Sequence, residues 1–134
     1  MNILVTGGAS GLGAAITKRL AADTNNNIYF TYNKSRDAAK KAEAELTNST
    51  SIKCDFTNTA ELKSLIDKMP QLDLDVLINN AYTGEFLKSH FHKIPSDVFL
   101  SDFKENVIPV IEITQSAISS FRKKRLGKII TILT

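Results

Sequence analysis

A glycine-rich segment, Thr6-Gly7-Gly8-Ala9-Ser10-Gly11-Leu12-Gly13, has the residue types and spacing that point most directly to chemistry. It follows the short apolar run Ile3 to Val5 and precedes a helical pattern, so we expect a buried strand to turn into a helix here. The first N–H groups of a helix lack partners within it, and glycines without a Cβ let an anion approach them closely. The segment is therefore predicted to bind phosphate.

Two other phosphate-binding motifs do not fit this segment. A P-loop needs Lys followed by Ser or Thr after its last glycine, whereas Ala14-Ala15 follows Gly13. The Gly-x-Gly-x-x-Gly fingerprint needs a third glycine where Ile16 stands. The pattern that remains is Thr-Gly-x-x-x-Gly-x-Gly. On this motif alone, a glycine turn without a ligand is the alternative, because glycine also serves turn geometry.

Composition is that of a cytoplasmic protein with one domain over residues 1–134. The chain is 43% hydrophobic and 23% charged, which suffices for one core. No apolar run approaches the roughly 18 residues of a membrane-spanning helix, and we expect no signal peptide. A lone cysteine, Cys54, excludes an internal disulfide framework and fits a reducing compartment. The net charge of +3 suits an anionic ligand, but nucleic acid would need a focused basic face.

Strand-like and helix-like segments alternate along the chain. The expected strands are 3–5, 28–32, 51–54, 74–78 and 128–134, the expected helices are 11–23, 36–46, 59–69 and 97–124, and residues 82–95 are expected to form a loop. This alternation predicts an α/β fold with a doubly wound parallel sheet, the Rossmann fold, in strand order 3-2-1-4-5. In such a sheet the ligand lies where the strand order reverses, above strands 1 and 4.

Several helix boundaries are also predicted. Ser35 is expected to cap the second helix, and Asn58 with Glu61 has the spacing of a capping box for the third, which Pro70 is expected to end. Pro109 is expected to kink the long helix because it has no N–H to donate. The spacing of the apolar residues predicts one buried stripe along that helix, made of Phe99, Phe103, Val107, Val110, Thr114, Ile118 and Phe121.

The glycine pattern and four further segments resemble the short-chain dehydrogenase/reductase family. Within it the chain looks most like the N-terminal part of a 3-oxoacyl-(acyl-carrier-protein) reductase. The four segments are Cys54-Asp55-Phe56, Asn79-Asn80-Ala81, Asn106 in the long helix, and Gly127 to Thr134. The chain departs from the family at Tyr82, where the Asn-Asn-Ala-Gly motif has glycine. The resemblance implies hydride transfer between a nicotinamide cofactor and a ketone.

The resemblance also implies roles for individual residues. The pyrophosphate would be held by Gly7, Ser10, Gly11, Leu12 and Gly13, the adenine by Asp55 and Phe56, and the nicotinamide side by Asn80 and Ala81. Asn106 would serve a proton relay through its main-chain carbonyl, and Thr134 would orient the substrate carbonyl. Three alternatives stay open, since Asp55 could simply end a strand, Asn106 could simply face solvent, and Thr134 could reflect the β propensity of threonine.

The end of the second strand bears on cofactor choice. It reads Tyr32-Asn33-Lys34-Ser35-Arg36, without the acid with which NAD enzymes of this type grip the ribose hydroxyls. Lys34 is available to a phosphate, and Asn33, Ser35 and Arg36 are predicted to bind the 2′-phosphate. NADP(H) is therefore favoured over NAD(H). Many NADP-dependent relatives carry Arg or Lys where this chain has Ser10, and that support is missing here.

The family's Tyr-x-x-x-Lys pair, which supplies the general acid and its activating cation, does not occur in the sequence. The chain is therefore expected to be an inactive piece of a longer enzyme, cut after the fifth strand. The resemblance implies a small-molecule or acyl-carrier-bound ketone as substrate and a homo-oligomeric parent. A non-catalytic nucleotide-binding sensor or scaffold with the same fold is the alternative.

Two other clusters are not predicted to be sites. His90 and His92 have no third metal ligand nearby, so no metal is expected. The basic run 122–125 lies at a helix C-terminus, where cations offset the helix dipole. We therefore expect neither nucleic acid nor a membrane as a partner.

Overall fold

A parallel sheet in the order β3-β2-β1-β4-β5 organises the computed structural model, which describes residues 1–84 and 89–133. The strands of the described residues are β1 Asn2–Val5, β2 Asn27–Tyr32, β3 Ser49–Lys53, β4 Val76–Asn79 and β5 Lys128–Thr131. The helices are α1 Gly11–Ala21, α2 Arg36–Glu45, α3 Thr59–Leu72, the 3-10 turn η1 Phe91–Lys93, α4 Ser96–Asp102, the π-helix η2 Phe103–Val107 and α5 Ile108–Lys124. The predicted fold class and strand order are confirmed. The expected loop 82–95 contains η1, which the sequence pattern missed.

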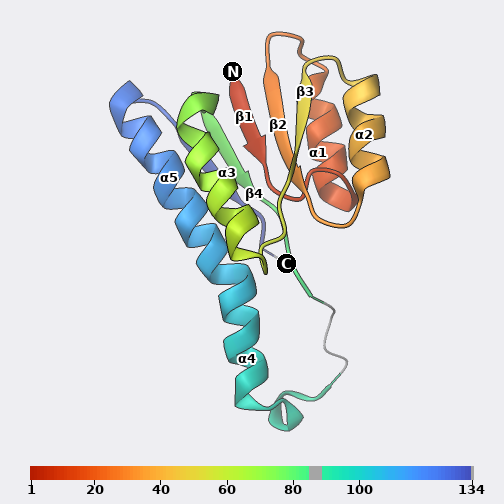
Figure 1. Cartoon of the computed structure of the whole chain (residues 1–134), viewed down its shortest axis with the longest axis vertical. Coiled ribbons are helices and arrows are strands. Elements are labelled where there is room, and N and C mark those ends of the chain that lie inside the picture. The colour runs from red at the N-terminus through yellow and green to blue at the C-terminus, as the bar shows by residue number, and fades with distance from the viewer. Residues whose placement is uncertain (85–88, 134) are drawn as a thin grey trace.

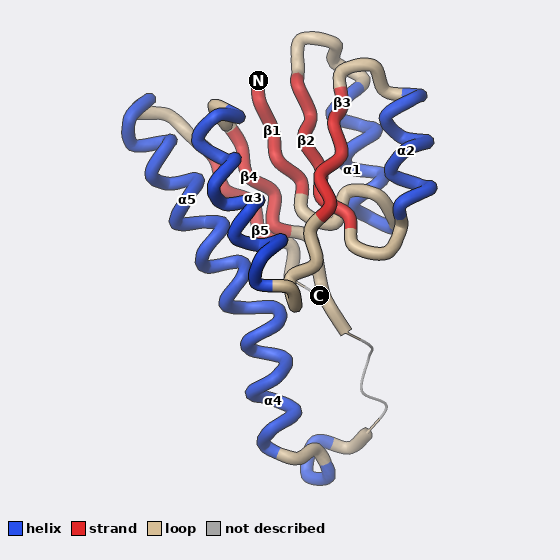
Figure 2. The backbone as a smooth tube through the Cα atoms, viewed as in Figure 1, coloured by secondary structure: helices blue, strands red, loops and turns tan. Residues whose placement is uncertain are grey.

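Helices cover both faces of the sheet. Figure 1 shows α3 and α5 together on one face and α1 and α2 on the other, and Figure 2 shows the strands between these two layers. Because side chains alternate along a strand, β1 contributes Leu4 to the core beneath α3 and α5, and Ile3 and Val5 to the core beneath α1 and α2. Buried strands of this kind place their carboxyl ends at one edge, where the loops gather.

The third helix, α3, begins after the expected N-cap but does not end at Pro70, where it was expected to end. Asn58 Oδ1 accepts hydrogen bonds from the amides of Ala60 and Glu61, so Asn58 is the N-cap. Pro70 does not end the helix, which continues to Leu72 and stops at Asp73 in the left-handed conformation. A proline near the end of a helix deprives only one carbonyl of its donor, which the packing of α3 tolerates. Glu61 does not complete the capping box; its carboxylate binds other groups, described below.

Ser35 occupies the N-cap position of α2, as expected, but its side chain makes no capping hydrogen bond. In α1 the buried residues are Gly13, Thr17 and Ala21, whereas Leu12 is 57% exposed. The face that packs on the sheet is set by the close approach of Gly13 to the glycine turn, and this rotates Leu12 outward.

The long helix is divided into α4, η2 and α5. The π-helix η2 directly precedes α5, and Pro109 stands in the first turn of α5, so the regular α-helix is interrupted next to the residue where a kink was expected. The face of α5 that contacts the core is Pro109, Ile113, Ala117 and Phe121. Within the predicted stripe Phe121 is buried, Val110 and Thr114 are half-buried, and Ile118 is exposed. The prediction is wrong for Phe99, Phe103 and Val107, which are exposed because this part of the helix, beginning with α4, extends beyond the sheet (Figure 1).

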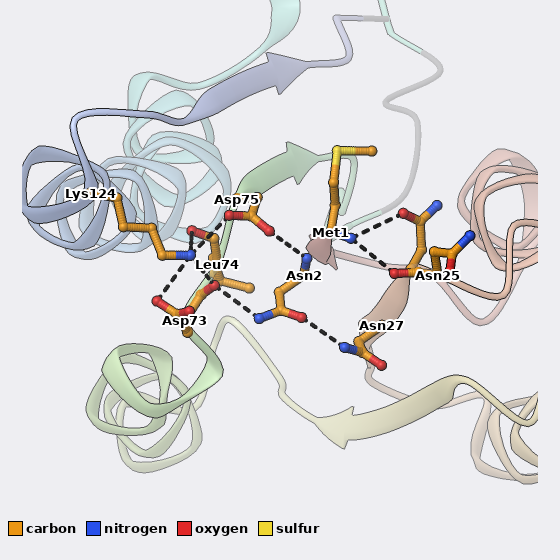
Figure 3. Close-up of polar contacts among 9 residues, drawn as sticks. Met1, Asn2, Asn25, Asn27, Asp73, Leu74, Asp75 and Lys124 are labelled. Atoms are coloured by element: carbon orange, nitrogen blue, oxygen red, sulfur yellow. Dashed lines mark hydrogen bonds and ion pairs between the residues drawn. The ribbon is translucent and has the colours of Figure 1, made fainter.

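A polar network fixes the amino ends of the central strands (Figure 3). Lys124 Nζ, at the end of α5, contacts one carboxylate oxygen each of Asp73 and Asp75 at 2.9 Å. The other oxygen of Asp75 accepts the amide of Asn2 at 2.8 Å. The hydrogen bond from Lys124 and the one from the Asn2 amide lower the pKa of Asp75. The network therefore ties α5 to β1 and β4 at the edge opposite the loops.

None of the helices in residues 1–84 and 89–133 has the length and apolar character needed to cross a bilayer.

Candidate functional site

A cavity of about 500 Å³ lies at the carboxyl edge of the sheet. Its walls come from the glycine turn, the ends of β2 and β3 and the segment after β4: Gly7, Ala9, Ser10, Leu12, Gly13, Thr31, Tyr32, Asn33, Lys34, Ser35, Cys54, Asp55, Phe56, Thr57, Asn80, Ala81, Tyr82, Thr83 and Gly84. Segments distant in sequence therefore meet where the strand order reverses, the position predicted for a ligand.

Hydrogen bonds to the end of β2 hold the backbone of the glycine turn in place. The Gly7 amide donates to Thr31 Oγ1 at 2.9 Å and the Gly8 amide to the Thr31 carbonyl at 2.9 Å. Gly7 has φ +67°, a conformation that favours glycine. Gly13 lies so close to Gly7 that a Cβ there would overlap the Gly7 carbonyl oxygen. Glycine at 13 is therefore required for α1 to begin directly against the turn.

The start of α1 faces the cavity. Ser10 is the N-cap, and its carbonyl accepts the Ala14 amide at 3.0 Å, but its side chain makes no capping hydrogen bond. The earlier amides of α1 have no intrahelical partner, because the first turn of any helix leaves them unpaired. Gly11, with φ +52°, is not among the lining residues, although the other predicted turn residues are. This arrangement can accept an anion at the helix N-terminus.

The segment after β4 is fixed against the same turn. The amides of Asn80 and Ala81 both donate to Thr6 Oγ1, at 2.9 and 3.0 Å. The Asn80 side chain donates from Nδ2 to the carbonyls of Thr6 and Gly7, at 3.0 and 3.3 Å. Asn80 and Ala81 thus line the cavity in a position set by backbone contacts.

One end of the cavity is formed by the residues after β3. Asp55 Oδ1 accepts hydrogen bonds from the amide and the hydroxyl of Thr57, at 2.9 and 2.8 Å. Burial raises the pKa of Asp55, but the hydrogen bonds from Thr57 and Asn33 outweigh it, so the pKa is lowered and the carboxylate is charged at neutral pH. Glu61 Oε2 accepts the Asp55 amide at 2.7 Å and so helps to hold this turn in place.

The segment after β2 forms the neighbouring wall. Asn33, Lys34 and Ser35 line the cavity, whereas Arg36, the first residue of α2, does not. On the adjacent strand, Lys53 Nζ lies 3.4 Å from Asn33 Oδ1 and 2.9 Å from Glu61 Oε2. Among the lining residues that the structure describes, Lys34 is therefore the cation of the cavity wall.

Asn106 lies in η2, half-buried, and binds the chain just beyond Ala81. Its Oδ1 accepts the Thr83 amide at 2.6 Å, and its Nδ2 donates to the Thr83 carbonyl at 2.9 Å and to Asp102 Oδ1 at 3.0 Å. It is not a cavity-lining residue, and its side chain does not simply face solvent. Asn106 therefore positions the segment that lines this end of the cavity.

Thr134, the other predicted catalytic residue, lies outside the described residues. The strand that leads to it, β5, pairs with β4, and Asn79 Nδ2 donates across this pair to Thr131 Oγ1 at 3.4 Å and to Thr114 Oγ1 of α5 at 3.1 Å. The buried Asn79 thus connects the last strand to the sheet.

Some lining residues were missed by the sequence reasoning. Thr31, Tyr32, Thr57, Thr83 and Gly84 all contribute to the cavity. For two of them the sequence did contain a signal. Thr31 and Tyr32 end a strand whose neighbour carries the glycine turn, and the carboxyl ends of parallel strands meet at one edge of the sheet.

The remaining candidate groups form no metal centre in residues 1–84 and 89–133. His90 and His92 stack with ring centroids 5.8 Å apart, and no group of three or more His, Cys, Asp or Glu side chains suited to a metal occurs in these residues. Burial, with a smaller contribution from Glu61, raises the pKa of the Cys54 thiol to about 11, so it is protonated at neutral pH.

The chain is similar to proteins named as short chain dehydrogenases or reductases, both in sequence and in structure. A family model described as short chain dehydrogenase matches residues 1–134. The 3-oxoacyl-(acyl-carrier-protein) reductase MabA of Mycobacterium avium is 30% identical over 133 residues, which are 98% of this chain and 48% of that protein. A crystal structure of a short chain dehydrogenase from Burkholderia cenocepacia in complex with NADP is 31% identical with a TM-score of 0.76, covering 97% of this chain and 54% of that one.

The chain is also similar to a protein that is not named as a reductase or dehydrogenase, the cyclic-di-GMP-binding biofilm dispersal mediator protein of Escherichia coli K12. It is 40% identical over 85 residues, which are 63% of this chain and 34% of that protein. The chain spans about half the length of the relatives that it matches from end to end.

Proposed function

Because the chain belongs to the short-chain dehydrogenase family, we propose that it is the cofactor-binding part of an oxidoreductase that uses NADP(H) to reduce a ketone to a secondary alcohol. The observation that carries this proposal is the N-terminus of α1, which faces a cavity of about 500 Å³ with its first amides available to an anion. A dinucleotide has its pyrophosphate near its middle, and the cavity extends to either side of this turn.

Each wall of the cavity has a proposed task. Gly7, Ser10, Leu12 and Gly13 would surround the pyrophosphate, and Gly11 would provide the turn that lets α1 begin. Asp55, whose Oδ1 accepts hydrogen bonds from Thr57, would accept a hydrogen bond from the adenine amino group, with Phe56 beside it. Asn80 and Ala81 would flank the nicotinamide side, since their amides are fixed by Thr6.

The preference for NADP(H) over NAD(H) rests on the wall after β2. Lys34 lines the cavity and no acidic residue accompanies it between Tyr32 and Ser35. A carboxylate there would repel a 2′-phosphate, whereas an ammonium attracts it. Asn33 and Ser35 would donate further hydrogen bonds, and Arg36 would contribute at longer range from the start of α2.

The nicotinamide, when bound, supplies the hydride. The chain's own residues orient the reactants: Asn106 holds the backbone beside Asn80 and Ala81 and would offer its main-chain carbonyl to a proton relay, and Thr134 would orient the substrate carbonyl. The substrate proposed is a small or acyl-carrier-bound 3-oxoacyl-like ketone, as the name of the Mycobacterium avium relative states for that protein. The whole protein is proposed to be a homo-oligomer.

Thermal unfolding with NADPH or NADH tests the cofactor proposal. At a hundredfold excess over Kd, a ligand stabilises the folded state by about 2.7 kcal/mol, so NADPH should raise Tm by roughly 10 °C and NADH by much less. Lys34→Ala should remove most of this difference, and Arg36→Ala should remove less of it. Equal shifts with both cofactors would contradict the 2′-phosphate assignment, and no shift with either would contradict dinucleotide binding.

A second candidate is a nucleotide-binding sensor or scaffold. The relative from Escherichia coli, 40% identical over the part it shares, is named for binding cyclic-di-GMP. The same titration with cyclic-di-GMP distinguishes the two functions: a large shift with cyclic-di-GMP and none with NADPH would favour the sensor.

A further inference from the structure

Glu61, in the first turn of α3, uses its side chain in a way that its sequence position does not predict. In a capping box its carboxylate would accept the Asn58 amide, but that amide donates to the Asp55 carbonyl at 3.0 Å. Glu61 Oε2 instead accepts the Asp55 amide at 2.7 Å. The start of α3 therefore binds both backbone polar groups of Asp55.

A cation holds the same oxygen of Glu61. Lys53 Nζ, at the end of β3, lies 2.9 Å from Glu61 Oε2 and 3.4 Å from Asn33 Oδ1. The hydrogen bond from Lys53, followed by the one from the Asp55 amide, lowers the pKa of Glu61, so this side chain is a carboxylate at neutral pH. A charged oxygen is a stronger acceptor for the Asp55 amide than a neutral one.

Glu61 acts from outside the cavity. Asp55 lines the cavity, whereas neither Glu61 nor Lys53 is among the lining residues that the structure describes. Because the Asp55 amide is bound to Glu61 and the Asp55 carbonyl to Asn58, the backbone that carries the Asp55 carboxylate has little freedom. A binding group that is already fixed loses less entropy when a ligand meets it. Glu61 therefore affects a ligand through Asp55 rather than by contact.

We propose that Glu61 is a positioning residue for the adenine end of this site: its carboxylate holds the Asp55 amide, and this directs the Asp55 carboxylate at the adenine amino group. The inference rests on the proposed function, which assigns that amino group to Asp55. It adds a residue of α3 that lines no part of the cavity described here.

Two cofactors that differ in one group test this inference. Deamino-NADPH carries hypoxanthine, which has a carbonyl oxygen where adenine has its amino group, so it cannot donate that hydrogen bond to Asp55. We would measure the dissociation constants of NADPH and deamino-NADPH by isothermal titration calorimetry with the wild-type chain and its variants. The ratio of the two constants reports how well Asp55 recognises the amino group. Partial unfolding, or a change of charge near the phosphates, alters both constants alike and leaves their ratio unchanged.

The wild-type chain should bind NADPH about tenfold more tightly than deamino-NADPH, the effect of one hydrogen bond to a charged acceptor. In Glu61→Ala the Asp55 amide has no acceptor, so this ratio should fall to about threefold. Glu61→Gln should keep the wild-type ratio, because an amide oxygen can take the place of Oε2. Asp67→Ala is the matched control and should also keep it, since Asp67 is another carboxylate of α3 that pairs with a lysine, Lys63 at 3.2 Å.

A ratio in Glu61→Ala equal to that of the wild type would overturn the role of Glu61, as would a ratio in Glu61→Gln as low as in Glu61→Ala. The proposed function fails in other ways. If the wild-type chain bound neither cofactor, the cavity would not be a dinucleotide site, and if Asp55→Ala kept the wild-type ratio, Asp55 would not bind the adenine amino group. Where the wild type binds both cofactors and Asp55→Ala loses the ratio, the Glu61 variants decide the role of Glu61 alone.

Discussion

Replacing Gly13 with alanine tests the geometry of the glycine turn. A Cβ at residue 13 would overlap the Gly7 carbonyl oxygen and lie 2.5 Å from Asn80 Nδ2 and 2.9 Å from the Gly7 carbonyl carbon. Two of these three atoms are backbone, so a rotamer change cannot relieve the contact. Overpacking at sites of this kind costs about 1–3 kcal/mol, and the rigid neighbours place Gly13→Ala at about 3 kcal/mol.

Gly11→Ala is the matched control. An alanine there would meet nothing within 4 Å, although its φ of +52° is unfavourable for a side chain and costs about 1–2 kcal/mol. Part of this cost is offset, because alanine lowers the entropy of the unfolded chain. The net loss expected for Gly11→Ala is therefore about 1 kcal/mol.

The assay is urea unfolding of the ligand-free variants at neutral pH, followed by far-ultraviolet circular dichroism. Gly13→Ala should lose clearly more free energy of unfolding than Gly11→Ala and should also bind NADPH more weakly, because its clash displaces Gly7 and Asn80. If Gly13→Ala were as stable as the wild type, or no less stable than Gly11→Ala, the tight approach of α1 to the turn would be refuted.

Four further results are expected. Asn106→Leu leaves the Thr83 amide and carbonyl without their partner and should lower the free energy of unfolding in urea by about 1–3 kcal/mol. A loss below about 0.5 kcal/mol would contradict the role of Asn106 in holding Thr83 in place. The pKa of Asp75 is lowered from 3.8 in the folded state, so its stabilisation is present above that value and lost as pH falls through the folded pKa; Tm of Asp75→Asn should therefore fall less steeply below pH 4 than that of the wild type. Leu65→Ala, at a fully buried site on the face of α3 that packs on the sheet, should cost about 2–5 kcal/mol by the same unfolding assay. Cys54, buried with a pKa of about 11, should resist iodoacetamide at pH 8 until urea is added, and rapid labelling of the folded chain would show that the thiol is accessible.

The sequence alone was enough for the architecture. Short apolar strands alternate with helical patterns, and the handedness of parallel crossovers leaves few possible strand orders, so β3-β2-β1-β4-β5 could be predicted. The glycine turn could be found from its glycine spacing at the end of a strand, and the segments that contain Asp55 and Asn80 from the resemblance to the short-chain dehydrogenase/reductase family. The proposed roles of these residues remain predictions.

Only the tertiary structure decided which faces are buried and which side chains meet. Leu12 fits the apolar spacing of α1 yet is exposed, because the contact of Gly13 with Gly7 sets the rotation of the helix. Lys34 rather than Arg36 reaches the cavity, and Asn106 binds Thr83 across a gap of 23 residues in the chain. Periodicity and spacing describe neighbours along one element, whereas these contacts depend on how separate elements are rotated and brought together in space.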